Sequence, residues 1–116
     1  MKQPGHILII DDDEDILAAG KLLLKRHFEL VIPCNTPEKI PKLLAEQSFD
    51  AILLDMNFGP GESSGQQGFH WLDVIMSQDS NAVVIMITAH GGVNVAVEAM
   101  KKGATDYVAK PWAVSY

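Results

Sequence analysis

Four groups of polar residues in this chain have the chemistry to hold a cation and a phosphoryl group. They lie far apart in the sequence, yet each comes directly after a short apolar run: Asp11 with Asp12, Asp55, Thr88, and Lys110 with Pro111. Carboxylates ligate hard divalent cations, whereas a hydroxyl and an amine stabilise the oxygens of a phosphoryl group. The residue types indicate a site for both, if the fold brings the four groups together.

The apolar runs are typical of buried strands. We expect five strands, at His6 to Ile10, Glu29 to Cys34, Phe49 to Asp55, Ala82 to Ile87 and Thr105 to Ala109. Amphipathic stretches separate the runs, and this alternation predicts an α/β fold whose parallel sheet is covered on both faces. The carboxyl ends of parallel strands share one edge of the sheet, where ligands bind. The four polar groups are therefore expected to converge at that edge.

The stretches between the strands have helical periodicity. We expect four helices. The first begins near Asp13, the second has Thr36 as its N-cap and Pro37 as its first residue, and the others cover Gly68 to Gln78 and Gly91 to Lys102. The buried side of the first helix is predicted to be Ile16, Leu17, Ala19, Gly20, Leu23 and Leu24. Pro41 lacks a backbone donor, so we expect a kink or a delayed start in the second helix. No helix follows the fifth strand, so residues 1–116 are expected to be one domain of a longer protein.

The composition is that of an ordinary globular domain, with 47% hydrophobic and 21% charged residues among 116. A net charge of −6 without a Lys/Arg cluster argues against direct contact with nucleic acid. The apolar run near the amino terminus is too short for a signal peptide or a membrane span. Cys34 is the only cysteine, which fits a buried thiol in a reducing cytoplasm. We expect a cytoplasmic protein.

The acidic residues suit a divalent cation. Neighbouring carboxylates repel one another, and a bound cation removes that cost. We expect Asp12 and Asp55 to ligate Mg²⁺ directly, and Asp11 to bind it through a water molecule. Aspartate is also a favoured N-cap residue, so helix capping is an equal alternative for Asp11 and Asp12 taken by themselves.

Asp55 ends a buried apolar run, which is a costly place for a charge without a partner. A carboxylate that attacks phosphorus forms an aspartyl phosphate. Lys110 would neutralise the phosphoryl oxygens, and the Thr88 hydroxyl would donate a hydrogen bond to them. Alone, Lys110 would be read as a surface lysine and Thr88 as an ordinary strand-end threonine. Their common position at strand ends favours the phosphoryl site.

With these residues in this order, the chain resembles the receiver domain of two-component response regulators. The resemblance covers nearly the whole chain and is carried by Ile7 to Asp13, Leu53 to Met56, Ile87 to Ala89 and Ala104 to Trp112. It implies a flavodoxin-like, doubly wound sheet with strand order 2-1-3-4-5. It also implies that Asp55 accepts a phosphoryl group from a sensor histidine kinase, with Mg²⁺ or Mn²⁺ as cofactor. Such a domain is a regulatory phosphoacceptor and not a turnover enzyme.

Further roles follow from the resemblance. Asn57 would offer a backbone carbonyl to the metal, and Ala89 a backbone amide to the phosphoryl group. Pro111 would follow a cis peptide bond, which costs little before proline. Tyr107 matches the aromatic residue that moves between exposed and buried positions as Thr88 moves toward the phosphate. Apart from the resemblance, Gly91 to Lys102 is a weak helix, with two glycines and three valines, and is suited to move. We expect this helix and the fifth strand to form the output surface.

The segment Val93 to Trp112 is similar to receivers of bacterial enhancer-binding transcription activators. That similarity implies an output region with an ATPase and a DNA-binding domain in the full-length chain, hence transcription regulation, and a homodimer is a further expectation. The missing last helix leaves the dimer open, because in the family this helix forms part of the common dimer surface.

The chain also departs from the family pattern beside the acceptor. Gly68 lies thirteen positions after Asp55, where about eight are usual, and loops tolerate such changes at little cost. The extra residues, within Phe58 to Gln67, would either alter metal access, kinase docking or phosphate lifetime, or have no role.

Three other functions compete with this interpretation. A phosphatase of the haloacid dehalogenase type needs a second aspartate two residues after the nucleophile, where this chain has Asn57. A flavodoxin-like flavin binder needs a phosphate loop after the first strand, where five acidic residues stand. A pseudo-receiver that acts by phosphorylation-independent protein interaction is the remaining alternative, and the presence of all four polar groups argues against it.

Overall fold

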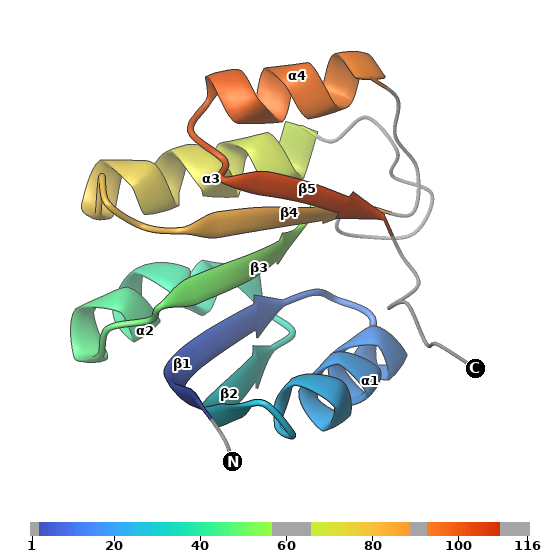
Figure 1. The fold of residues 1–116 in the computed structure, drawn as a ribbon. Coiled ribbons are helices and arrows are strands. Elements are labelled where there is room, and N and C mark those ends of the chain that lie inside the picture. Colours follow the sequence, from blue (N-terminus) through green and yellow to red (C-terminus); the bar gives the residue numbers. More distant parts are fainter. Residues whose placement is uncertain (1–2, 57–65, 89–92, 110–116) are drawn as a thin grey trace.

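Five parallel strands form a single sheet in the order β2-β1-β3-β4-β5 (Figure 1). The computed structural model describes residues 3–56, 66–88 and 93–109. Its strands are β1 (Gln3–Ile10), β2 (Phe28–Cys34), β3 (Ala51–Asp55), β4 (Val84–Thr88) and β5 (Asp106–Ala109). The predicted doubly wound, flavodoxin-like sheet is thus confirmed, with strand ends within a few residues of those expected.

Helices cover both faces of the sheet (Figure 1). They are α1 (Glu14–Leu24), the 3₁₀ helix η1 (Pro37–Lys39), α2 (Ile40–Glu46), α3 (Gln66–Gln78) and α4 (Val93–Lys101). Helix α1 packs on one face, and α2, α3 and α4 pack on the other. Among the described residues, no helix has the length and apolarity that a membrane span requires.

The two faces of the sheet carry two separate cores, because successive side chains of a strand point to opposite sides. Leu8 and Ile10 of β1 belong to the larger core, under α2, α3 and α4. Ile7 and Ile9 of the same strand belong to the smaller core, against Leu17 of α1. All four of these strand residues are almost fully buried, as expected for a central strand covered on both faces.

The second helical segment starts late, as the position of Pro41 predicts. A single 3₁₀ turn precedes α2, and Pro41 occupies the first turn of α2, where a missing backbone donor costs nothing. The expected N-cap at Thr36 is only partly correct. Thr36 does hold the N-cap position, but its hydroxyl donates to Asn35 Oδ1 at 2.8 Å and makes no capping bond.

The predicted buried side of α1 is too wide. Leu17 and Gly20 are buried, Ile16, Leu23 and Leu24 are half-buried, and Ala19 is exposed. The assignment of Ala19 to the core is therefore wrong, because Leu17 and Leu24 of α1 pack in the smaller core whereas no described residue covers Ala19. The expected absence of a helix after β5 falls on residues 110–116, outside the described part of the chain.

Candidate functional site

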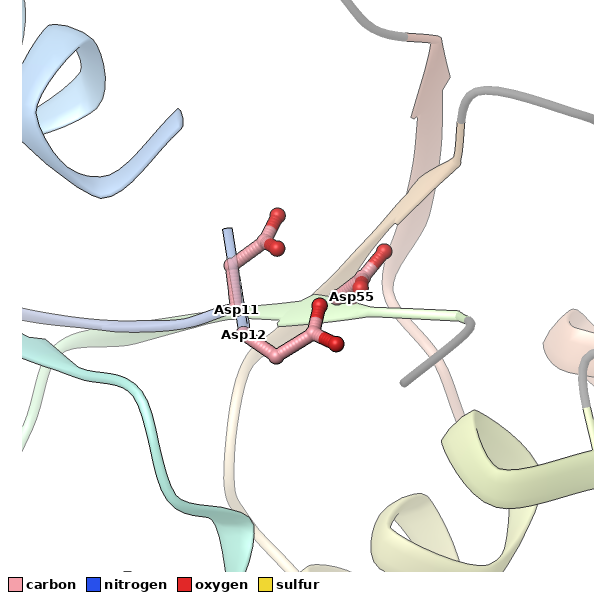
Figure 2. Close-up of side chains that lie close together, drawn as sticks. All are labelled: Asp11, Asp12 and Asp55. Carbon is pink, nitrogen blue, oxygen red and sulfur yellow. The ribbon is translucent and has the colours of Figure 1, made fainter. Parts of the chain in front are cut away.

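Three carboxylates meet at the carboxyl edge of the sheet. Asp11, Asp12 and Asp55 each offer a carboxylate oxygen, and these atoms all lie within 4.8 Å of one another. Figure 2 shows the three side chains gathered at the ends of β1 and β3. The register explains the meeting, because Ile10 pairs with Leu54 and each strand continues directly into an aspartate. The sequence predicted this convergence.

Asp11 is the most deeply placed of the three. It is 0% exposed, and its backbone amide donates to the carbonyl of Cys34 on β2 at 3.1 Å. Its Oδ1 accepts a hydrogen bond of 2.9 Å from the backbone amide of Asp13. Asp11 is thus held through both its backbone amide and its side chain, whereas Asp12 beside it is exposed.

The carboxylate that caps α1 is that of Asp13. Its Oδ1 accepts from the amides of Asp15 at 2.9 Å and Ile16 at 3.4 Å, which satisfies donors at the start of the helix. Capping was the alternative considered for Asp11 and Asp12, and the structure assigns that task to their neighbour. The sequence could not single out Asp13, because five successive acidic residues offer several equally suitable caps.

A side-chain hydrogen bond links the start of α1 to the residue that follows β2. The Asn35 side-chain amide donates to Glu14 Oε1 at 2.7 Å. Cys34, just before it, is buried as predicted, and its thiol donates to the Thr36 carbonyl at 3.0 Å. The contact between Asn35 and Glu14 was not predicted, since nothing in the sequence pairs residues of these two elements.

Thr88 ends β4, the strand next to the one that carries Asp55. Asp55 pairs with Ile87, so Thr88 lies one residue further along the neighbouring strand. Both side chains are nearly inaccessible, with Asp55 2% and Thr88 3% exposed. Two buried polar side chains thus stand at adjacent strand ends, as the sequence predicted.

Tyr107 lies on β5, where it pairs with Met86 of β4. Its ring is half-buried and packs against the larger core. Its hydroxyl is buried and has no hydrogen-bond partner among the described residues. Tyr107 is therefore turned toward the core. The movement expected from the resemblance remains a prediction.

Four of the predicted site residues cannot be placed. Asn57, Ala89, Lys110 and Pro111 lie outside the described residues, so the expected approach of Lys110 to Asp55 stays a prediction. The same holds for most of the extended connection, of which only the two ends are described, at Met56 and from Gln66 onward.

The acidic cluster fits a hard divalent cation. Its donors are carboxylate oxygens, which such ions prefer, and two of the three aspartates are almost fully buried. Three like charges this close repel one another, most strongly at Asp11 and Asp55, where water is excluded. Asp11, Asp12 and Asp55 are the residues that would hold the ion.

Comparison with known proteins identifies the family to which this chain belongs. Residues 7–115 match the response regulator receiver domain. The chain belongs to this family. The receiver resemblance inferred from the sequence is thereby confirmed.

Relatives of this receiver include transcription regulators. It is 34% identical over 113 residues to the alginate biosynthesis transcriptional regulatory protein AlgB of Pseudomonas aeruginosa, covering 95% of this chain and 23% of that protein. The chain thus spans less than a quarter of the length of this relative.

Two solved structures illustrate the similarity in three dimensions. The N-terminal signal receiver domain of a two-component response regulator from Bacteroides fragilis has a TM-score of 0.83 and 38% identity, with 96% of this chain and 88% of that one covered. The beryllofluoride-activated NtrC4 receiver domain dimer has a TM-score of 0.79 and 32% identity, with 94% and 86% covered.

Proposed function

We propose that this receiver is a phosphorylation-dependent switch in which Asp55 accepts a phosphoryl group from a phosphohistidine of a sensor kinase. The observation that carries the proposal is the cluster of Asp11, Asp12 and Asp55 carboxylates within 4.8 Å. Such a cluster is costly unless a cation neutralises it, and a carboxylate beside a bound cation is suited to accept a phosphoryl group. Membership of the receiver family supports the same reading.

In the transfer, an oxygen of the Asp55 carboxylate forms a bond to phosphorus while the bond from phosphorus to the histidine nitrogen breaks. The electron pair of that bond stays on the imidazole nitrogen of the kinase. Bound Mg²⁺ would supply positive charge that neutralises the carboxylates and the phosphoryl oxygens. The Thr88 hydroxyl would donate to a phosphoryl oxygen, and Lys110 would contribute a positive charge.

Asp11 and Asp12 would hold the cation, with Asp11 kept in place by the amide of Asp13. The proposed contacts of Asn57 and Ala89 through their backbones, and the cis peptide before Pro111, complete the site by resemblance to the family. This receiver would catalyse only its own phosphorylation and slow dephosphorylation. The chain therefore serves as a regulatory substrate of a kinase.

The proposed output is a change in α4 and β5. Phosphorylation adds nearly two negative charges and several acceptor oxygens beside Thr88. As Thr88 moves toward them, Tyr107 would adjust its position against the larger core. In the full-length chain this change would control an output region with an ATPase and a DNA-binding domain, and hence transcription. The NtrC4 receiver, which forms a dimer when activated, supports a homodimer as one form of the switch.

Acetyl phosphate and Mg²⁺ test the proposal, with intact mass as the measurement. The wild type is expected to gain one phosphoryl group, and Asp55→Asn none. Asp79→Asn is the matched control, because Asp79 is exposed just after the last residue of α3 and its Oδ1 accepts from the Asn81 amide at 3.0 Å, which an asparagine can still do. A folded wild type that binds Mg²⁺ but gains no mass would favour the pseudo-receiver.

A further inference from the structure

The amino-terminal turn of α3 touches the backbone just after Asp55. The amide of Gly68, the third residue of α3, donates to the Met56 carbonyl at 2.9 Å. A Cβ at Gly68 would lie 2.6 Å from both the Cα and the carbonyl oxygen of Met56. These are backbone atoms, which cannot turn aside as a side-chain tip can. Only glycine allows the two segments to approach this closely.

Met56 is also bonded to β4. Its amide donates to the Ile87 carbonyl of β4 at 2.9 Å, and the residue is 0% exposed. The peptide after Asp55 is thus clamped between β4 and α3. Consecutive Cα atoms are about 3.8 Å apart at a fixed distance, so a displacement of Met56 is passed on to Asp55.

We propose that Gly68 is a positioning residue for Asp55. By closing the hydrogen bond from α3 to Met56, it fixes the acceptor carboxylate whatever the number of residues in the connection between them. The length of the connection between Met56 and Gly68 is therefore expected to leave the positions of Asp11, Asp12 and Asp55 unchanged. This inference rests on the proposed function and explains how the site tolerates a long connection directly beside its acceptor.

The change in unfolding free energy on Gly68→Ala has one sign if Gly68 is a positioning residue and the opposite sign if it is an ordinary helical residue. Alanine is a better helix former than glycine, so Gly68→Ala would raise the unfolding free energy if Gly68 were only a helical residue. The close approach predicts the opposite, a lower midpoint of denaturant unfolding. Ser77→Ala, an exposed change in the same helix, is the control for α3 itself.

Mg²⁺ affinity, measured by titration calorimetry, reports the effect on the cluster. Gly68→Ala is expected to weaken Mg²⁺ binding by about tenfold or more, because ligands must be held to within a fraction of an ångström. Removal of residues 59–63 restores the shorter spacing between Asp55 and Gly68. It is expected to change the Mg²⁺ affinity by less than about twofold, because the hydrogen bond from Gly68 to Met56 is kept. A large loss in the shortened protein, or none in Gly68→Ala, would overturn the proposal.

Amide NMR keeps the inference testable where other readouts fail. In the wild type, the Gly68 amide is expected to be protected from exchange to the same degree as the Met56 amide, and an unprotected Gly68 contradicts the clamp. In Gly68→Ala, the largest shift changes outside the residues next to position 68 are expected at Asp55 and Met56, without any added cation. If the wild type bound no Mg²⁺, the proposed function would fail, while these shifts would still decide the role of Gly68.

Discussion

The backbone amide of Asp13 donates to Oδ1 of Asp11 at 2.9 Å, while the Asp13 carboxylate caps α1. One short turn therefore joins a buried member of the acidic cluster to the start of a helix. The two aspartates stand two residues apart and perform opposite tasks. Asp11 is held in the cluster despite repulsion, whereas Asp13 stabilises the helix that follows. Substitutions at these positions should change stability in opposite directions.

Asp11→Asn is expected to stabilise the protein when no divalent cation is present. The amide oxygen of asparagine can still accept from the Asp13 amide, so this hydrogen bond is kept while the charge is removed. Removing one of three carboxylates within 4.8 Å should raise the unfolding free energy by about 1–3 kcal/mol. Urea unfolding in the presence of a chelator measures the change.

In excess Mg²⁺ the wild type should have a higher unfolding free energy than Asp11→Asn. The wild type gains unfolding free energy from the bound ion, and Asp11→Asn gains less because it has one carboxylate fewer. Asp79→Asn, which removes a charge outside the cluster, is expected to behave like the wild type in both conditions. Equal Mg²⁺-dependent stabilisation of wild type and Asp11→Asn would remove Asp11 from the cation site.

Asp13→Ala is expected to lower the unfolding free energy by about 1 kcal/mol, because two amides at the start of α1 lose their acceptor. Asp13→Asn should retain most of the stability, since asparagine caps helices comparably well. The amide of residue 13 is unchanged in both variants, so Mg²⁺ affinity should stay within about twofold of wild type. Thermal unfolding and calorimetric titration together check this separation.

The convergence of the acidic residues could be predicted because it depends on simple regularities. Apolar runs that end in Asp11 and Asp55 identify buried strands, and parallel strands present their carboxyl ends at one edge. The delayed start of α2 could be predicted for a similar reason, since Pro41 restricts the backbone by its own covalent structure.

Features that depend on tertiary contacts could not be predicted from the sequence. The periodicity of α1 marks Ala19 as a core residue, but how much of a helix surface is covered depends on how the helix sits on its sheet. Gly68 appears in the sequence only as a plausible helix start. Its closeness to Met56 depends on how α3 docks against the end of β3, which no local pattern records.

Gly103→Ala is expected to lower the unfolding free energy by about 1–2 kcal/mol, the cost of a left-handed backbone for a residue with a Cβ. Gly103 has φ +109° and follows α4, where its amide donates to the Met100 carbonyl at 3.1 Å and the Ala104 amide to the Ala99 carbonyl at 3.0 Å. This pair of bonds is the Schellman arrangement.

The side chain at residue 103 would add a second, smaller cost, because its Cβ would lie 3.3 Å from Met76. Asparagine tolerates the left-handed region better than alanine, so Gly103→Asn should lose less stability in urea unfolding. A neutral Gly103→Ala would contradict the left-handed end of α4.

Thr88→Ala should separate phosphorylation from switching. Asp55 and the acidic cluster remain, so the variant is expected to take up a phosphoryl group from acetyl phosphate, as judged by intact mass. What it lacks is the hydroxyl through which β4 would respond to the new charge. Addition of beryllofluoride with Mg²⁺ is expected to change amide exchange across α4 (Val93–Lys101) and Tyr107 in the wild type.

In Thr88→Ala that change in exchange rate should fall by about fivefold or more, the lower end of typical coupling between two sites. Thr88→Ser keeps the hydroxyl and should retain most of the response, which excludes a mere loss of packing at this 3% exposed position. Asp55→Asn should lose both phosphorylation and response. If Thr88→Ala responded like the wild type, the signal would have to reach α4 by a route that bypasses the end of β4, and the proposed switch would be wrong.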